Sequence, residues 1–373
     1  MEHTVATESR PSVAPEPEDS SQFAGTMPVP PQHQLDEAVL ARYLQVHLPG
    51  FRGPLKVELF KGGQSNPTYR LQADSGQYVL RAKPGPVARL LPSAHAIERE
   101  FRVLSALSAT DVPVARVYCL CEDESVIGRA FYVMQMVQGR VLWEQSLPDM
   151  KRDERGEIYD EMNRVLARLH SIEPASVGLA DFGKPGNYFA RQIGRWTRQY
   201  QASETRPIDA MNRLMAWLPD HVPDDDTTTI VHGDYRLDNL IFDTQQPRVL
   251  AILDWELSTL GHPLADFSYH CMSWHIPPGH FRGIAGLDLA ALGIPSEQTY
   301  VERYCQRTGR DIDQVMAHWD FYLAYNLFRL AAILQGIVKR VAEGTASNTR
   351  APATAERVEP LAQIGWQIAQ RVR

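Results

Sequence analysis

Cysteine, excess positive charge and long apolar runs are all scarce in this chain of 373 residues. Four cysteines are too few for a disulfide framework, and Cys119 and Cys121 are spaced more closely than the cysteines of a zinc knuckle. Lysine and arginine number 38 against 45 aspartates and glutamates, and the net charge of −7 argues against a nucleic-acid partner. No apolar run approaches the roughly 20 residues that a membrane span needs. We therefore expect a protein of the reducing cytoplasm with no membrane span.

The pattern of apolar residues predicts an α+β fold with two lobes. Residues 1–33 are rich in Pro, Glu, Ser and Thr and lack periodic apolar positions, which predicts a disordered tail without a secretory signal. A β-rich N-lobe is expected over 34–138 and a mainly helical C-lobe over 139–373. The clearest elements are expected strands at 57–60, 68–71, 77–83, 112–118 and 130–137, and expected helices at 94–107 and 318–340.

Three polar side chains stand at set intervals between Ile230 and Trp255. Asp234 and Asn239 are five residues apart, and a Leu-Ile-Phe run follows Asn239 at once. A second apolar run ends at Asp254. The simplest geometry is a hairpin that carries Asn239 and Asp254 to the same end, with Asp234 on the loop before it.

This arrangement suits phosphoryl transfer. Asn239 and Asp254 would hold Mg²⁺ on the nucleotide phosphates, and Asp234 would accept the proton of an attacking hydroxyl. The spacing matches the His-x-Asp-x-x-x-x-Asn loop of protein kinases, in the form His232-Gly-Asp234. The alternative is a polar hairpin whose carboxylates only cap turns. Three groups at this spacing favour the catalytic interpretation.

Upstream residues supply a candidate nucleotide site. Gly62, Gly63, Ser65 and Asn66 lie between two expected strands, where glycines let backbone N–H groups approach phosphates, although a plain hairpin turn fits too.

Two cations on the next strand could reach the phosphates. Arg81 and Lys83 share one face by the two-residue period, and Arg81 is the better match. Glu100 lies in the middle of an apolar helical stripe, whereas Glu98 lies beside it. A buried charge is costly unless paired, so we expect Glu100 to pair with Arg81 or Lys83.

Several runs resemble the aminoglycoside-phosphotransferase and choline-kinase-like family, and most closely the kinase domain that some organisms fuse to acyl-CoA dehydrogenases. The matching runs are 62–69, 97–102, 231–240, 253–261 and 331–336. The resemblance implies a bilobal protein-kinase-like fold, ATP as phosphoryl donor, Mg²⁺, and the hydroxyl of a small molecule as acceptor. It further implies a 4-hydroxyacyl-CoA thioester as substrate. His262 departs from the family pattern, which would place an acidic residue there.

The resemblance also implies roles for individual residues. Adenine contacts would lie at Gln135 to Val137, and His232 and Asp266 would support the catalytic loop. Arg236 would either touch the phosphoryl group or pair with a carboxylate of the C-lobe.

Substrate contacts are expected where cations mix with aromatic residues in the C-lobe. These residues are Trp274, Arg329, Lys339 and Arg340. Two alternatives remain at this point: a kinase of the same fold for an aminoglycoside, choline or a sugar, and a nucleotide-binding scaffold without catalysis.

Overall fold

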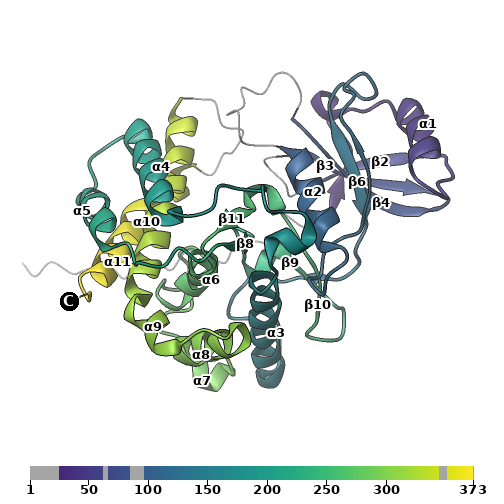
Figure 1. Ribbon diagram of the computed structural model, residues 1–373. Helices are drawn as coiled ribbons and strands as arrows, with labels where there is room; N and C mark the ends of the chain where they lie inside the picture. Colours follow the sequence, from purple (N-terminus) through teal and green to yellow (C-terminus); the bar gives the residue numbers. More distant parts are fainter. Residues whose placement is uncertain (1–24, 62–65, 85–95, 344–350, 373) are drawn as a thin grey trace, which may run out of the picture.

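The N-terminal part of the chain forms a six-stranded antiparallel sheet (Figure 1). The structure is a computed structural model that describes residues 25–61, 66–84, 96–343 and 351–372. The strands in spatial order are β1 (Thr26–Met27), β2 (Lys56–Phe60), β3 (Thr68–Ala73), β4 (Gly76–Ala82), β6 (Phe131–Gln135) and β5 (Val117–Cys121).

The two faces of this sheet belong to two different cores. On β6, Phe131 and Val133 pack in a core shared with α1 (Glu37–His47), while Tyr132 between them joins the core that contains α2 (Ile97–Leu107). This alternation is the two-residue period of a strand. The core on the α2 side continues into the helical part of the chain, so α2 connects the two lobes through buried apolar contacts.

The C-lobe is built mainly from helices packed around α10 (Trp319–Ala342). By length and hydropathy α10 resembles a membrane span, but 83% of its apolar window is buried inside the fold. Packing against the helices around it accounts for that apolar character. The other α-helices of the described residues are α3 (Arg152–His170), α4 (Tyr188–Ser203), α5 (Asp209–Trp217), α6 (Pro263–Cys271), α7 (Leu289–Leu292), α8 (Glu297–Thr308), α9 (Ile312–Ala317) and α11 (Ala351–Ala369).

Two small antiparallel sheets lie between the helices. One has the order β10-β9-β7 and the other pairs β11 with β8. Gly139, just before β7, passes so close to β9 that a Cβ there would stand 2.3 Å from the carbonyl oxygen of Phe242. Only glycine permits this approach where the chain leaves the N-lobe. The strands are β7 (Arg140–Val141), β8 (Thr229–Val231), β9 (Leu240–Phe242), β10 (Val249–Ile252) and β11 (Thr259–Gly261).

The α+β bilobal architecture is confirmed, with two corrections in detail. The strand expected at 112–118 begins only at Val117; Pro113 before it has no N–H, and its carbonyl accepts from Ile252 in the C-lobe. The expected tail also extends too far, because Thr26 and Met27 pair with β2 and residues 31–33 form a 3₁₀ turn. Residues 1–24 lie outside the described part of the chain.

One buried histidine makes the stability of this fold sensitive to acid. His270 on α6 is surrounded by aromatic rings, including Tyr159, Trp274 and Tyr300, and burial lowers its pKa to about 3. An unfolded chain binds a proton at this residue below about pH 6.5, whereas the folded chain does not until about pH 3. The His270 contribution to stability is therefore full above pH 6.5 and declines as the pH falls.

We predict that lowering the pH from 7.5 to 5.0 costs about 2 kcal/mol of unfolding free energy through His270 alone. His270→Phe keeps an aromatic ring and removes the titrating group. Over the same pH change, its unfolding free energy should therefore fall by about 2 kcal/mol less than that of the natural protein. Urea unfolding of both proteins at both pH values measures the difference. Equal losses in the two proteins would show that His270 does not carry this effect.

Candidate active site

The predicted hairpin exists and brings Asn239 and Asp254 to one end. Strands β9 and β10 are antiparallel, with Leu240 opposite Ile252. Asn239 immediately precedes β9, and its carbonyl accepts a hydrogen bond of 2.8 Å from the Leu253 amide. Asp254 follows Leu253. The pairing therefore brings Asn239 and Asp254 to the same end of the hairpin, as the sequence predicted.

The loop before the hairpin is held by Asp266 at the start of α6. The carboxylate of Asp266 accepts the backbone N–H of His232 at 2.7 Å and that of Gly233 at 2.8 Å. Gly233 has a φ of 84°, and a Cβ there would lie 2.8 Å from the Leu257 carbonyl oxygen. The turn therefore requires glycine. His232 accepts from the Asp234 amide through Nδ1, so Nε2 carries the proton and donates to the Leu253 carbonyl.

Asp266 is ionised in this buried position because of its partners. Burial by itself would raise its pKa, but the hydrogen bond from His170 and the N–H of His232 outweigh burial and lower the pKa. His170 bonds Asp266 through Nε2 at 3.2 Å and Tyr304 through Nδ1 at 2.7 Å. The geometry of His232 and Asp266 fits the supporting roles expected of them.

Asp234 is oriented by two neighbours. The Asn239 side-chain amide donates to the backbone carbonyl of Asp234 at 2.9 Å and to its carboxylate at 3.0 Å. Arg236 Nε lies 3.1 Å from the same carboxylate oxygen and 3.7 Å from Asp238. The amide nitrogen of Asn239 is therefore engaged with Asp234, while its oxygen remains the atom suited to a metal.

Asp254 adopts a backbone conformation that few residues other than glycine accept. Its φ and ψ are both 61°, in the left-handed region, and its side chain is 33% exposed. Such strain is commonly found at functional sites. One carboxylate oxygen lies 2.6 Å from Arg81 Nη2.

Arg81 is the cation of the N-lobe that reaches this site. Its Nε lies 2.9 Å from Glu100 and its Nη2 lies 3.3 Å from Glu256. Burial alone would lower the pKa of Arg81, but Glu100 and Asp254 outweigh it and raise the pKa. Lys83 instead pairs with Glu98 in a separate, half-exposed contact. The pairing expected of Glu100 is therefore made by Arg81.

Glu100 is 2% exposed and accepts two further hydrogen bonds. Asn66 donates its side-chain amide at 2.9 Å, and Tyr132 donates its hydroxyl at 3.0 Å. Asn66 was expected to cover phosphates, but it is fully buried and supports the ion pair instead. Gly62, Gly63 and Ser65 lie outside the described residues. Gln135 ends β6 and Val137 follows it in the segment that leads to β7.

Sequence reasoning missed a second ion pair beside the catalytic loop. Arg282 contacts both carboxylate oxygens of Asp238, at 2.9 and 2.6 Å. Asp238 stands between Arg236 and Asn239 in the sequence, so its position in the motif could have singled it out. Arg282 lies 44 residues farther on and carries no comparable signal.

The residues expected to bind substrate are dispersed. Arg329 donates to the Gly233 carbonyl at 2.5 Å and so borders the catalytic loop. Trp274 is buried in the core, and its indole N–H donates to the Pro295 carbonyl, so its contacts give no support to a substrate role. Lys339 is ten residues from Arg329, about 15 Å along α10, and donates to the Ala202 carbonyl. Arg340 is exposed beside it.

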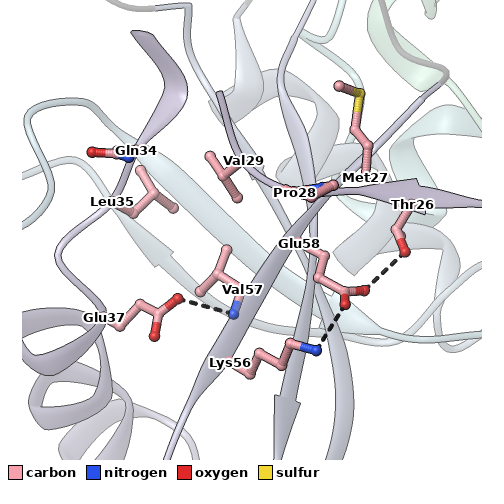
Figure 2. Close-up of a pocket in the computed structure, with 10 residues that line it drawn as sticks. All are labelled: Thr26, Met27, Pro28, Val29, Gln34, Leu35, Glu37, Lys56, Val57 and Glu58. Carbon is pink, nitrogen blue, oxygen red and sulfur yellow. Dashed lines mark hydrogen bonds and ion pairs between the residues drawn. The ribbon is translucent and has the colours of Figure 1, made fainter. Parts of the chain in front are cut away.

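A separate cavity of about 460 Å³ lies on the outer edge of the N-lobe (Figure 2). Residues of β1, β2 and the start of α1 line it, among them Val29, Leu35, Val57 and Glu58. Glu58 is already engaged by Thr26 and by Lys56. None of the residues predicted to bind nucleotide or metal lines this cavity. The cavity is therefore separate from the candidate active site.

Comparison with known proteins decides the family. Residues 56–318 match the model of the phosphotransferase enzyme family. The chain belongs to this family. It is a small-molecule kinase of this family.

This phosphotransferase is 45% identical over 350 residues to acyl-CoA dehydrogenase family member 10 of Mus musculus. The match covers 93% of this chain and 32% of the mouse protein, so the chain spans about a third of that relative. A crystal structure from Ralstonia eutropha, described as a candidate aminoglycoside phosphotransferase, is 58% identical with a TM-score of 0.83. It covers 91% of this chain and 100% of the other.

The fold is shared more widely. Amicoumacin kinase, solved with AMP-PNP and Ca²⁺, has a TM-score of 0.59 at 14% identity, covering 90% of this chain and 93% of that one. The likeness shows the protein-kinase-like fold and extends no further.

We predict that Asp234→Ala lowers kcat of this phosphotransferase by about 10²–10⁴-fold, the range for a lost general base, and leaves nucleotide affinity nearly unchanged. Asp254→Asn should also weaken Mg²⁺-dependent nucleotide binding, because it removes a charged oxygen ligand. Steady-state kinetics with calorimetric nucleotide titrations separate the two effects. An Asp234→Ala enzyme that keeps more than about a tenth of the rate would contradict the assignment, since that is a loss of only ~1.4 kcal/mol.

A second prediction compares two glutamates on α2. Glu100→Gln leaves Arg81 without its buried partner, so we expect the KM for nucleotide to rise about tenfold, or ~1.4 kcal/mol. Glu98→Gln is the matched control, because the Lys83 pair it breaks is half-exposed and should be worth little. Equal changes in nucleotide KM for the two variants would show that burial of Glu100 has no bearing on the site.

Proposed function

We propose that this phosphotransferase transfers the γ-phosphoryl group of ATP to the hydroxyl of a hydroxyacyl-CoA, with a 4-hydroxyacyl-CoA as the favoured substrate. The observation that carries the proposal is the 45% identity of nearly the whole chain to a part of acyl-CoA dehydrogenase family member 10. A phosphorylated hydroxyl is a far better leaving group than hydroxide. Such a kinase would prepare a hydroxyacyl thioester for elimination and then for oxidation.

The residues divide the work as follows. Asp234, oriented by Asn239 and Arg236, accepts the hydroxyl proton while the hydroxyl oxygen bonds to the γ-phosphorus. The bond from that phosphorus to the β–γ bridging oxygen breaks, and ADP leaves. The transition state is loose, so positioning matters more than the basicity of Asp234.

Asn239 and Asp254 fit a magnesium ion. They offer one amide oxygen and one carboxylate, and Mg²⁺ usually takes one or two carboxylates together with substrate phosphates. The bound ion would neutralise charge on the β- and γ-phosphates. In the described residues, no group of three or more His, Cys, Asp or Glu side chains is arranged to hold a metal. Arg81, fixed by Glu100, would contact the phosphates from the N-lobe side.

An aminoglycoside acceptor is the second candidate, because the Ralstonia eutropha structure carries that description. Aminoglycosides are polycations, which bind best where carboxylates are free. Beside Asp234 this chain places the guanidinium groups of Arg236 and Arg329, and the nearby Asp238 is paired with Arg282. This distribution of charge favours an acceptor that carries a carbonyl group or negative charge.

We predict that a 4-hydroxyacyl-CoA exceeds its free hydroxy acid by at least ~10²-fold in kcat/KM, equivalent to about 2.7 kcal/mol. Binding energy from the remote nucleotide part of CoA can orient the small hydroxyl and so increase kcat as well as lower KM. ADP production is measured with both compounds, and with choline and kanamycin as controls. Equal efficiency with the free acid, or faster turnover of kanamycin, would reject the proposal.

A further inference from the structure

Arg329 is a buried cation at the catalytic loop. Its side chain rises from α10, is 6% exposed, and donates through Nη2 to the carbonyl of Gly233, the residue before Asp234. The guanidinium lies over the rings of Tyr269, at 4.9 Å, and Trp196, at 5.8 Å. Two aromatic faces and one carbonyl therefore surround a full positive charge.

The charge of Arg329 has no carboxylate partner in the described part of the chain. Arg81 has three carboxylates within ion-pair distance and Arg236 has two, whereas no ion pair involves Arg329 among those residues. Aromatic faces offset only part of the cost of burying a cation. A buried cation with no carboxylate within ion-pair distance, at a catalytic loop, is suited to an electron-rich group of the ligand.

The remaining donors of Arg329 are accessible for such a group. Five N–H groups radiate from a guanidinium, and within the described residues one of its nitrogens is used, in the bond to Gly233. None of the Arg329 nitrogens is both fully enclosed and without a partner. The nitrogens that do not bond Gly233 therefore border space that solvent reaches. The indole N–H of Trp196, under the same guanidinium, is enclosed and unpartnered. Around the Arg329 guanidinium there are thus more hydrogen-bond donors than acceptors.

The position of Arg329 identifies which part of the acceptor it would meet. Gly233 adjoins the base, and Asp234 is among the charges that raise the pKa of Arg329, so a group bound by Arg329 would lie near the reacting hydroxyl. The phosphates of CoA are a whole pantetheine arm away from the acyl chain and cannot be that group. In an extended 4-hydroxyacyl chain the hydroxyl and carbonyl oxygens are roughly 6 Å apart, from ordinary bond lengths. A carbonyl oxygen is therefore within range.

We propose that Arg329 binds the carbonyl or carboxylate oxygen of the acceptor and thereby sets the distance from that oxygen to the phosphorylated hydroxyl. The inference rests on the proposed function, because it assumes an acyl acceptor. To the proposed function it adds a basis for substrate specificity: the enzyme selects an acceptor that carries an oxygen at a fixed distance from its hydroxyl group.

The test compares two acceptors that differ in one oxygen. 4-Hydroxypentanoyl-CoA carries the thioester carbonyl, and S-(4-hydroxypentyl)-CoA, a thioether, has a methylene in its place. The natural enzyme should prefer the thioester by at least tenfold in kcat/KM, about 1.4 kcal/mol. Arg329→Gln should abolish this preference by lowering activity on the thioester at least tenfold more than activity on the thioether. Free 4-hydroxypentanoate tests whether a carboxylate can replace the thioester carbonyl.

Arg195→Gln is the matched control, because Arg195 covers the same Trp196 ring at 5.2 Å but is exposed on α4. It should keep the preference of the natural enzyme. ATP hydrolysis without acceptor reports the integrity of the catalytic loop, and the ratio of thioester to thioether activity in Arg329→Gln is measured separately from any loss of that hydrolysis. If that variant does not fold, Arg329→Lys, which keeps the charge but loses the forked geometry, should retain a reduced preference.

The outcomes separate the two ideas. Equal loss on thioester and thioether in Arg329→Gln, with slower ATP hydrolysis, would mean that Arg329 only supports the Gly233 carbonyl, and would overturn the inference. A natural enzyme that phosphorylates both compounds equally would also overturn it while leaving the proposed function intact. A natural enzyme that phosphorylates neither compound would reject both.

Discussion

The contact between Arg81 and Asp254 is the interaction on which the site depends. Arg81 belongs to the N-lobe sheet, and Asp254 follows the hairpin of the C-lobe. Because Glu100 on α2 holds the other side of the guanidinium, one cation connects the sheet, the helix and the hairpin. A buried arginine with several carboxylates tolerates burial only while all of them stay in place. The relative position of the two lobes and the geometry at Asp254 are therefore coupled.

The catalytic loop is held by a comparable arrangement from the opposite side. Asp266 fixes the N–H groups of His232 and Gly233, and Arg329 fixes the carbonyl of Gly233. Both come from helices of the C-lobe core, where side-chain positions are restricted by packing. Phosphoryl transfer depends on positioning more than on strong acid–base chemistry. A loop whose backbone N–H groups and carbonyl are both held meets that requirement, because the next residue, Asp234, then has little freedom.

The arginines near Asp234 differ in how their charges are balanced. Arg81 and Arg236 are surrounded by carboxylates, and Arg282 is matched to Asp238, so these three shape the site from within. Arg329 is buried against aromatic faces and a carbonyl. The charges of Arg81, Arg236 and Arg282 are therefore balanced by the protein itself, whereas the charge of Arg329 would be balanced by an acceptor.

The amino-acid sequence by itself determined the bilobal fold, the hairpin with Asn239 and Asp254 at one end, and the burial of Glu100. These features follow from local spacing and from the periods of strand and helix. The tertiary structure decided which partner each polar group meets. Asn66 turns inward to Glu100, Arg282 reaches Asp238 across 44 residues, and Arg329 reaches Gly233 across 96. Such pairs leave no period in the sequence, because they depend on how separate elements pack, and only packing brings them within hydrogen-bonding distance.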